Sequence, residues 1–160
     1  MRRVSIALLI FGVLVALMAP AALAASPHFI SASASGPNAS GSLTVPFKIA
    51  GLGANETITV TATADATAVY ACQNNAGNFP NAANKQQVSG PVSDSGQFTS
   101  GKNGQITGSL TLSPPPSTLN CPSGQHAVLA SVSYTNVQIS ATGVGAESIP
   151  GTFSRTFFNV

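Results

Sequence analysis

Thr57–Ala64 reads TITVTATA, so threonine alternates with an apolar side chain at every step. Alternation with a period of two residues predicts a β-strand with one buried face and one face turned to water. Threonine suits this pattern because it is β-branched, which favours the extended backbone, and still presents a hydroxyl group. The same period recurs in Ser42–Ile49 and in Ile106–Leu112. The chain is therefore predicted to be built from strands of this type.

Weaker alternating segments fill most of the remaining sequence. They are His28–Ser35, Ala66–Cys72, Gln86–Val92, Gly96–Ser100, Val128–Tyr134, Val137–Ala141 and Thr152–Phe158. Turn residues occur at short intervals along the chain, among them Gly90-Pro91 and the hairpin signal Asn103-Gly104. Many short strands of unequal length predict an all-β fold and favour an antiparallel β-sandwich over a closed sheet.

The apolar parity changes near Thr135-Asn136. Tyr134 follows one parity, whereas Val137 and Ile139 follow the other. Because side chains alternate between the two faces of a strand, a slip of one residue indicates a β-bulge or a strand that passes between sheets. The alternating faces predict that the core consists of Leu43, Val45, Phe47, Ile49, Ile58, Val60, Ile106, Leu110, Leu112, Val128, Val132, Tyr134, Phe153 and Phe157.

The N-terminus has the three parts of a secretory signal peptide. Arg2 and Arg3 carry positive charge, Val4–Met18 is almost entirely apolar, and Ala22-Leu23-Ala24 offers small residues for cleavage. We therefore expect residues 1–24 to be removed. Residues 25–160 are then expected to form a single secreted domain with no membrane association after cleavage. A retained single-span anchor is the alternative.

Charged side chains are scarce. The chain has six Lys and Arg residues and four Asp and Glu residues, and Arg2 and Arg3 belong to the leader. The domain that remains is neutral and lacks the electrostatic footprint of a protein that binds nucleic acid or an anionic membrane. The expected partner is an extracellular glycan or a protein, and no nucleic acid.

Cys72 and Cys121 are the two cysteines of the sequence. In an exported chain they are expected to form one disulfide, which would stabilise the fold by about 4 kcal/mol in the chain-entropy model. An intermolecular pair or free thiols are the alternatives. The histidines, His28 and His126, do not form a ligand cluster with them, so no metal and no cofactor is expected.

Two resemblances follow from short segments. Tyr70–Cys72, at the end of an alternating strand, resembles the Tyr-x-Cys step of immunoglobulin domains and implies an immunoglobulin-like antiparallel β-sandwich with one disulfide. The sequence has no Trp to pack on the bridge, and this Cys is the first of its pair. Together with Asn81–Lys85, Ser100–Gly104 and Ile149–Phe153, the segment is also similar to small secreted bacterial proteins of unknown function, which implies no activity.

Gln73–Lys85 is a long insertion that holds five asparagines directly after Cys72. Amide groups beside an aromatic ring suit carbohydrate recognition, because amides bond hydroxyl groups directionally and a ring packs on a sugar face. The candidate ligand-binding residues are Asn74, Asn75, Asn78, Phe79 and Asn81. In the alternative, asparagine is present because it tolerates left-handed backbone and bonds its own main chain.

The sequence has few of the residues and motifs that catalysis requires. His28 and His126 offer the only imidazole bases, no Gly-x-Ser-x-Gly elbow is present, and the acids are isolated in sequence. We therefore expect no catalytic residues. Asp65 and Asp94 lie outside any calcium-loop pattern, and Asn38 and Asn55 fit glycan-acceptor sequons.

The expected function is a secreted, non-enzymatic β-sandwich with an extracellular binding or cell-surface structural role. Two alternatives stay open. One is a small secreted hydrolase, which would require His126 to meet a serine and an acid in a cleft. The other is a module that binds or inhibits a protein partner through a rigid exposed loop.

Overall fold

The structure, a computed structural model, describes residues 26–80 and 84–160. Within these residues the chain forms two antiparallel β-sheets and no helix, which confirms the all-β prediction. The predicted signal peptide, residues 1–24, lies outside the described residues. No helix of the described part is long and apolar enough to cross a membrane.

The smaller sheet has three strands in the order β1-β2-β5. They are β1 (His28–Ala32), β2 (Leu43–Ala50) and β5 (Ile106–Leu112). The larger sheet has the order β4-β3-β6-β7, and a further strand, β8, pairs with β6. Its strands are β3 (Thr57–Asn74), β4 (Lys85–Thr99), β6 (Gln125–Ala141), β7 (Gly145–Ile149) and β8 (Phe153–Thr156).

The core lies between the two sheets and follows the alternation of the sequence. Along Thr57–Ala64 the apolar positions are buried and the threonines lie on the opposite face. The inward side of β2 is buried at every second residue. Phe47 and Phe98 meet edge to face across the sheets at 5.0 Å, and Gly108 leaves the room for this pair, since a Cβ there would lie 2.6 Å from Phe98. Eleven of the predicted core residues are buried, whereas Val128, Phe153 and Phe157 are half-buried.

Three pairs of predicted strands are fused into single long strands. Ala66–Cys72 continues the strand of Thr57–Ala64 as β3, because Asp65 points outward and does not interrupt the ladder. Gly90-Pro91, predicted as a turn, lies in the middle of β4. This strand is the edge of its sheet, where the missing N–H of proline is tolerated. Asn103-Gly104 does form a turn, but it joins β4 to β5 in the other sheet and not to a hairpin partner.

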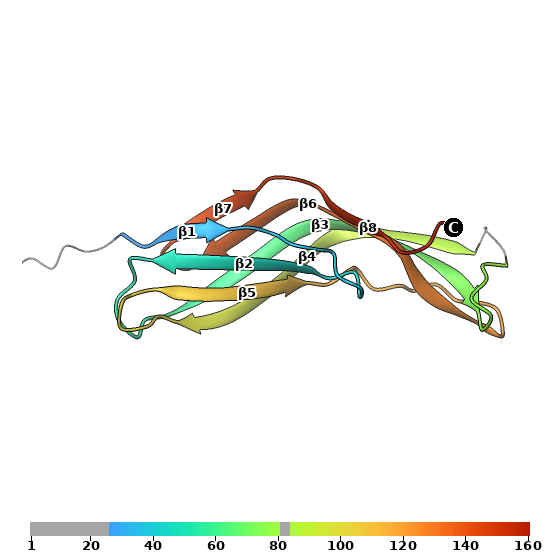
Figure 1. Cartoon of the computed structure of the whole chain (residues 1–160), viewed down its shortest axis with the longest axis horizontal. Coiled ribbons are helices and arrows are strands. Elements are labelled where there is room, and N and C mark those ends of the chain that lie inside the picture. Colours follow the sequence, from blue (N-terminus) through green and yellow to red (C-terminus); the bar gives the residue numbers. More distant parts are fainter. Residues whose placement is uncertain (1–25, 81–83) are drawn as a thin grey trace, which may run out of the picture.

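The long strands extend past the smaller sheet as an arm, which consists of residues 67–74, 85–89 and 125–133 (Figure 1). The proline-rich segment Ser113–Asn120 runs against this arm. The Tyr70 hydroxyl donates to the Pro115 carbonyl at 2.8 Å, and the Gln86 side chain bonds the Thr118 N–H at 2.9 Å. The C-terminus lies at the same end of the molecule (Figure 1).

The predicted register slip is a bulge within β6, not a change of sheets. Thr63 pairs with Gln138 and Asp65 pairs with Thr135, so Ala64 faces two residues of β6. These are Asn136 and Val137. A second shift between Val69 and Tyr70 leaves Ala130 of β6 as the additional residue. The sequence did not indicate this one, and it explains why Val128 does not share the burial of Val132.

Candidate functional site

The predicted binding loop, Gln73–Lys85, joins β3 to β4 at the free end of the arm (Figure 1). Asn74 uses its side chain within the loop, since its Oδ1 accepts the backbone N–H groups of Ala76 and Asn78 at 3.0 and 2.9 Å. The main chain closes the same turn, where the Asn74 N–H donates to the Asn78 carbonyl at 2.9 Å. At Asn74, therefore, the structure favours the turn-forming role of asparagine.

The remaining loop candidates are dispersed. Asn75 and Asn78 are exposed, and Asn81 lies outside the described residues. The ring of Phe79 packs on Phe158 of the C-terminal segment, with centroids 5.3 Å apart. Phe79 is consequently half-buried, and its partner Phe158 is 39% exposed. Phe158 was not among the sequence candidates, because nothing local in the sequence connects the C-terminus to this loop.

Cys72 and Cys121 form the predicted disulfide, with an S–S distance of 2.02 Å. The bond joins the end of β3 to the segment that precedes β6. The Cys72 N–H also donates to the Asn84 carbonyl at 3.1 Å, so both ends of the Gln73–Lys85 loop are fastened to the arm.

The outer face of the larger sheet, turned away from the smaller sheet, is covered by hydroxyl and amide groups. Threonines of β3 lie beside serines of its neighbours in regular rows, such as Ser95, Thr61 and Ser140. Several hydroxyls bond each other across strands, as Thr57 and Thr99 do at 2.8 Å. This face is the polar half of the alternation that defines the fold, and Asp65 is the charged residue at its centre.

The β6 bulge interrupts this face at Asn136. The residue has a left-handed backbone with a φ of 52°, which asparagine tolerates better than most residues. The extra residue turns Asn136 outward and leaves Val137 pointing into the core, 1% exposed. Bulges of this kind often redirect a side chain at a functional site.

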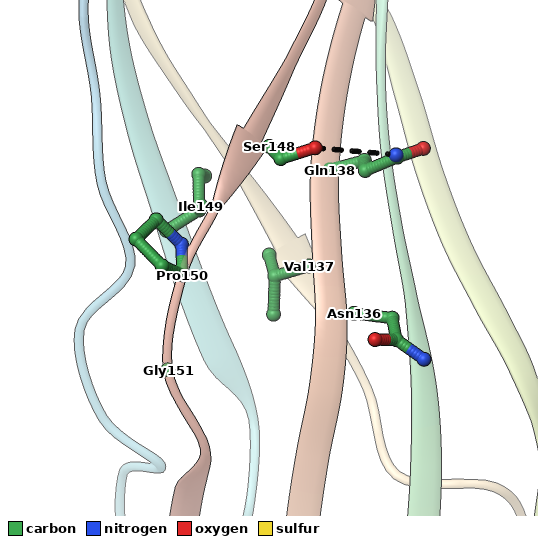
Figure 2. Close-up of a pocket in the computed structure, with 7 residues that line it drawn as sticks. All are labelled: Asn136, Val137, Gln138, Ser148, Ile149, Pro150 and Gly151. Atoms are coloured by element: carbon green, nitrogen blue, oxygen red, sulfur yellow. Dashed lines mark hydrogen bonds between the residues drawn. The ribbon is translucent and has the colours of Figure 1, made fainter.

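Two adjoining depressions lie on the outer face and share Asn136 and Gln138. One, of about 280 Å³, continues over Ser148 to Pro150 and Gly151 beyond β7 (Figure 2). The other, of about 300 Å³, continues over Thr63 and Asp65 of β3 to Pro91 of β4. We call the pair the Asn136 groove. It crosses the strands, with a proline at each end.

Polar side chains in the Asn136 groove hold one another in place. The Asn136 Nδ2 donates to Oδ2 of Asp65 at 2.8 Å, from β6 to β3. The Gln138 Nε2 donates to the Ser148 hydroxyl at 3.3 Å, from β6 to β7 (Figure 2). Among the described residues, no hydrogen bond is made to Oδ1 of Asp65, to the amide oxygen of Asn136 or to that of Gln138. Three oriented acceptors therefore face solvent on a rigid sheet.

Tyr134 fixes β6 just before the bulge. Its side chain is buried, and its hydroxyl donates to the carbonyls of Gly41 at 2.8 Å and Leu112 at 3.3 Å. Burial, with a smaller contribution from the charge of Tyr70, raises the pKa of Tyr134 to about 12. The neutral phenol thus joins the larger sheet to two segments outside it.

The two histidines, which the hydrolase alternative would need as bases, lie apart from the groove. His28 Nδ1 donates to the Ser26 carbonyl at 2.8 Å near the start of β1. His126 is exposed and pairs with Gln73 in the ladder at the end of the arm. In residues 26–80 and 84–160, neither ring bonds a serine hydroxyl, and no group of three or more His, Cys, Asp or Glu side chains is arranged to hold a metal ion.

The groove residues Asp65, Asn136, Gln138 and Ser148 were absent from the sequence candidates, although the parity change at Thr135-Asn136 marked their centre. That change indicates a bulge, but it does not reveal that Asp65 and Asn136 lie side by side on neighbouring strands. No family model matches the chain, and no curated protein or solved structure is similar enough to it to count as a match.

Proposed function

We propose that this chain is a secreted binding protein without a catalytic step, and that its ligand occupies the Asn136 groove. The observation that carries the proposal is the set of three outward acceptors, on Asp65, Asn136 and Gln138, at a bulge in a rigid sheet. Sites built on strands are held more accurately than sites on loops, so little order has to be gained on binding.

Secretion is supported by two independent features. The sequence begins with a charged, then apolar, then small-residue pattern that is typical of a signal peptide. The Cys72–Cys121 disulfide is a bond that forms and persists in oxidising compartments. A binding protein released into such a compartment meets ligands of the extracellular space.

We also propose an immunoglobulin-like sandwich. The strand orders β1-β2-β5 and β4-β3-β6-β7 correspond to the immunoglobulin strands A-B-E and C′-C-F-G, in which a seven-stranded core is divided between two sheets. The disulfide departs from that pattern, because it links the end of β3 to a loop and not the second strand to the sixth. The resemblance thus concerns the order of strands and not the Tyr-x-Cys step.

Binding is tested by nuclear magnetic resonance on the secreted, disulfide-bonded protein with nitrogen-15 labelling. Polysaccharide and protein fractions from the outside of the producing cell are added in turn. We expect shifts in the amide signals of Asp65, Asn136, Gln138 and Ser148. The variant Gln138→Ala should weaken them, and Gln97→Ala, on the same face beside Thr59, should not. Shifts confined to the Gln73–Lys85 loop, or none in any fraction, would contradict the proposal.

A further inference from the structure

We infer that the ligand of the Asn136 groove is an uncharged oligosaccharide. This inference rests on the proposed function and names the chemical class that the same site would take. It follows from the kinds of atoms the groove presents, from its charge and from its course across the sheet.

The groove offers acceptors, and a ligand must supply donors to them. Oδ1 of Asp65 and the amide oxygen of Asn136 belong to planar groups that are joined by a 2.8 Å hydrogen bond. Planar carboxylate and amide groups can engage two donors in fixed directions. Adjacent sugar hydroxyls provide such donors in pairs, and the hydroxyls of Thr63 and Ser148 at the groove can both donate and accept.

The charge of the groove disfavours anionic ligands. Asp65 carries a carboxylate, and neither depression is lined by Lys or Arg. An acidic sugar, a phosphate or a nucleic acid would bring negative charge toward Asp65 without a compensating cation.

A peptide ligand lacks the anchors it would need. Apart from Pro91 and Pro150 at its two ends, the apolar residues at the groove, Ala64, Val137 and Ile149, are at least 94% buried and offer little apolar surface to a side chain. Strand addition is also not available at β3, which lies inside the sheet and pairs with β4 on one side and β6 on the other. Protein interfaces depend on large anchors seated in desolvated pockets.

The shape of the groove fits a short linear sugar chain. From Pro91 on β4 to Ser148 on β7 it crosses three interstrand spacings of about 4.8 Å, or about 14 Å, the length of two to three sugar rings. Pro91 and Pro150 give each end an apolar, rigid surface on which the C–H face of a ring can rest. The hydroxyl rows on either side can bond a longer chain directly or through water.

The experiment is a titration of the labelled protein with three kinds of defined ligand. These are neutral gluco-, manno-, galacto- and arabino-oligosaccharides of three to six rings, acidic oligosaccharides of equal length, and lysine-rich hexapeptides. We expect at least one neutral oligosaccharide to shift the amides of Asp65, Asn136 and Gln138 in a saturable manner. Asp65→Ala should weaken that binding by at least about tenfold, since hydrogen bonds to a charged group are lost. Thr59→Ala, on the same face outside the groove, should leave it unchanged.

The outcomes separate this inference from the proposal on which it rests. If only acidic sugars or lysine-rich peptides shift the groove amides, the site is a binding site, and its assignment to neutral sugars is wrong. If a neutral sugar binds but shifts other residues, or if no neutral sugar binds, the inference is also wrong. If neither these ligands nor the cell fractions shift the groove amides, the proposed function fails as well. The folded state of Asp65→Ala is checked by its amide spectrum away from β3 and β6.

Discussion

The Gln73–Lys85 loop and the Asn136 groove both contain asparagine, but they use it differently. In the loop, the side-chain oxygen of Asn74 accepts hydrogen bonds from backbone N–H groups of its own turn. In the groove, the amide nitrogen of Asn136 donates a hydrogen bond to Asp65 on the neighbouring strand, and its amide oxygen faces solvent. The first arrangement closes a turn, whereas the second fixes the orientation of two polar groups. Asparagine content alone therefore identifies turns more readily than binding sites.

The attachment of the two regions to the core also differs. The loop is held at its base by the disulfide and at its tip by the contact of Phe79 with Phe158. The groove, by contrast, lies on a strand that is anchored in the core: Val137 and Ile139 of β6 are buried. Tyr134 of the same strand is also buried, and its hydroxyl donates to the Gly41 carbonyl. Variants that remove one of these contacts at a time show which region determines stability and which determines binding.

The largest effect is expected from removal of the disulfide in the variant Cys72→Ala/Cys121→Ala. The two cysteines are 49 residues apart, and opening a loop of this length lowers the free energy of unfolding by about 4 kcal/mol in the chain-entropy model. Denaturant unfolding of the variant and of the parent measures the difference. In the variant that remains folded, groove amides should keep their ligand response. A loss of groove binding under folding conditions would show that the two regions are coupled.

The next largest effect is expected from Tyr134→Phe. The change leaves the carbonyls of Gly41 and Leu112 without the phenol donor, at a cost of about 1–3 kcal/mol. Its dependence on pH has a definite sign. Because the pKa of Tyr134 is raised to about 12 in the folded state from 10.0, folding favours the neutral phenol. This stabilisation is complete below pH 10 and decreases as the pH rises from 10 toward 12.

Unfolding curves between pH 8 and pH 12 test this prediction. The parent should lose stability above pH 10 more steeply than Tyr134→Phe, in which the group that titrates is absent. Tyr70, whose pKa burial also raises, remains in both proteins and serves as the internal reference. Equal slopes in the two proteins would show that Tyr134 does not titrate with unfolding.

Much of the fold followed from the sequence, because burial in a sheet has a period that can be read directly. TITVTATA predicted the buried and exposed faces of β3. The parity change at Thr135-Asn136 predicted either a bulge or a change of sheet, and the structure has the bulge. Strand ends were less accurate, since the alternating segments were divided at Asp65 and a turn was predicted at Gly90-Pro91. An outward Asp and an edge-strand Pro are both compatible with a continuous strand.

The groove could not be predicted from the sequence, for a different reason. Asp65 and Asn136 are 71 positions apart, and their hydrogen bond depends on the pairing of β3 with β6 and on the left-handed backbone of Asn136. Periodicity indicates which face a residue occupies but not which residue lies beside it on the next strand. The loop, by contrast, was conspicuous because five asparagines lie within thirteen consecutive residues, but this composition was a poor guide to the site.

A moderate effect is expected when Asn136 is replaced by Ala or by Gly. Alanine is strained at the left-handed φ of 52° and should cost about 1–2 kcal/mol, whereas glycine adopts this backbone without a side-chain clash. Both variants lose the hydrogen bond to Asp65. Asn136→Gly should therefore unfold close to the parent in denaturant but bind the groove ligand more weakly. If glycine restores both stability and binding, the amide of Asn136 is a conformational element and not a contact.

The smallest effect is expected from replacing Asn74, Asn75, Asn78 and Asn81 together by Ser. Serine can still form weaker turn bonds at position 74, and Asn75 and Asn78 are exposed, so the free energy of unfolding should change by less than about 1 kcal/mol. Affinity for a ligand of the Asn136 groove should not change, because the loop lies at the far end of the arm. Denaturant unfolding and the same amide titration measure both quantities on one sample. If the folded variant no longer binds the ligand, the binding site lies in the loop. The bulge at Asn136 is then only an irregularity in the pairing of β3 with β6.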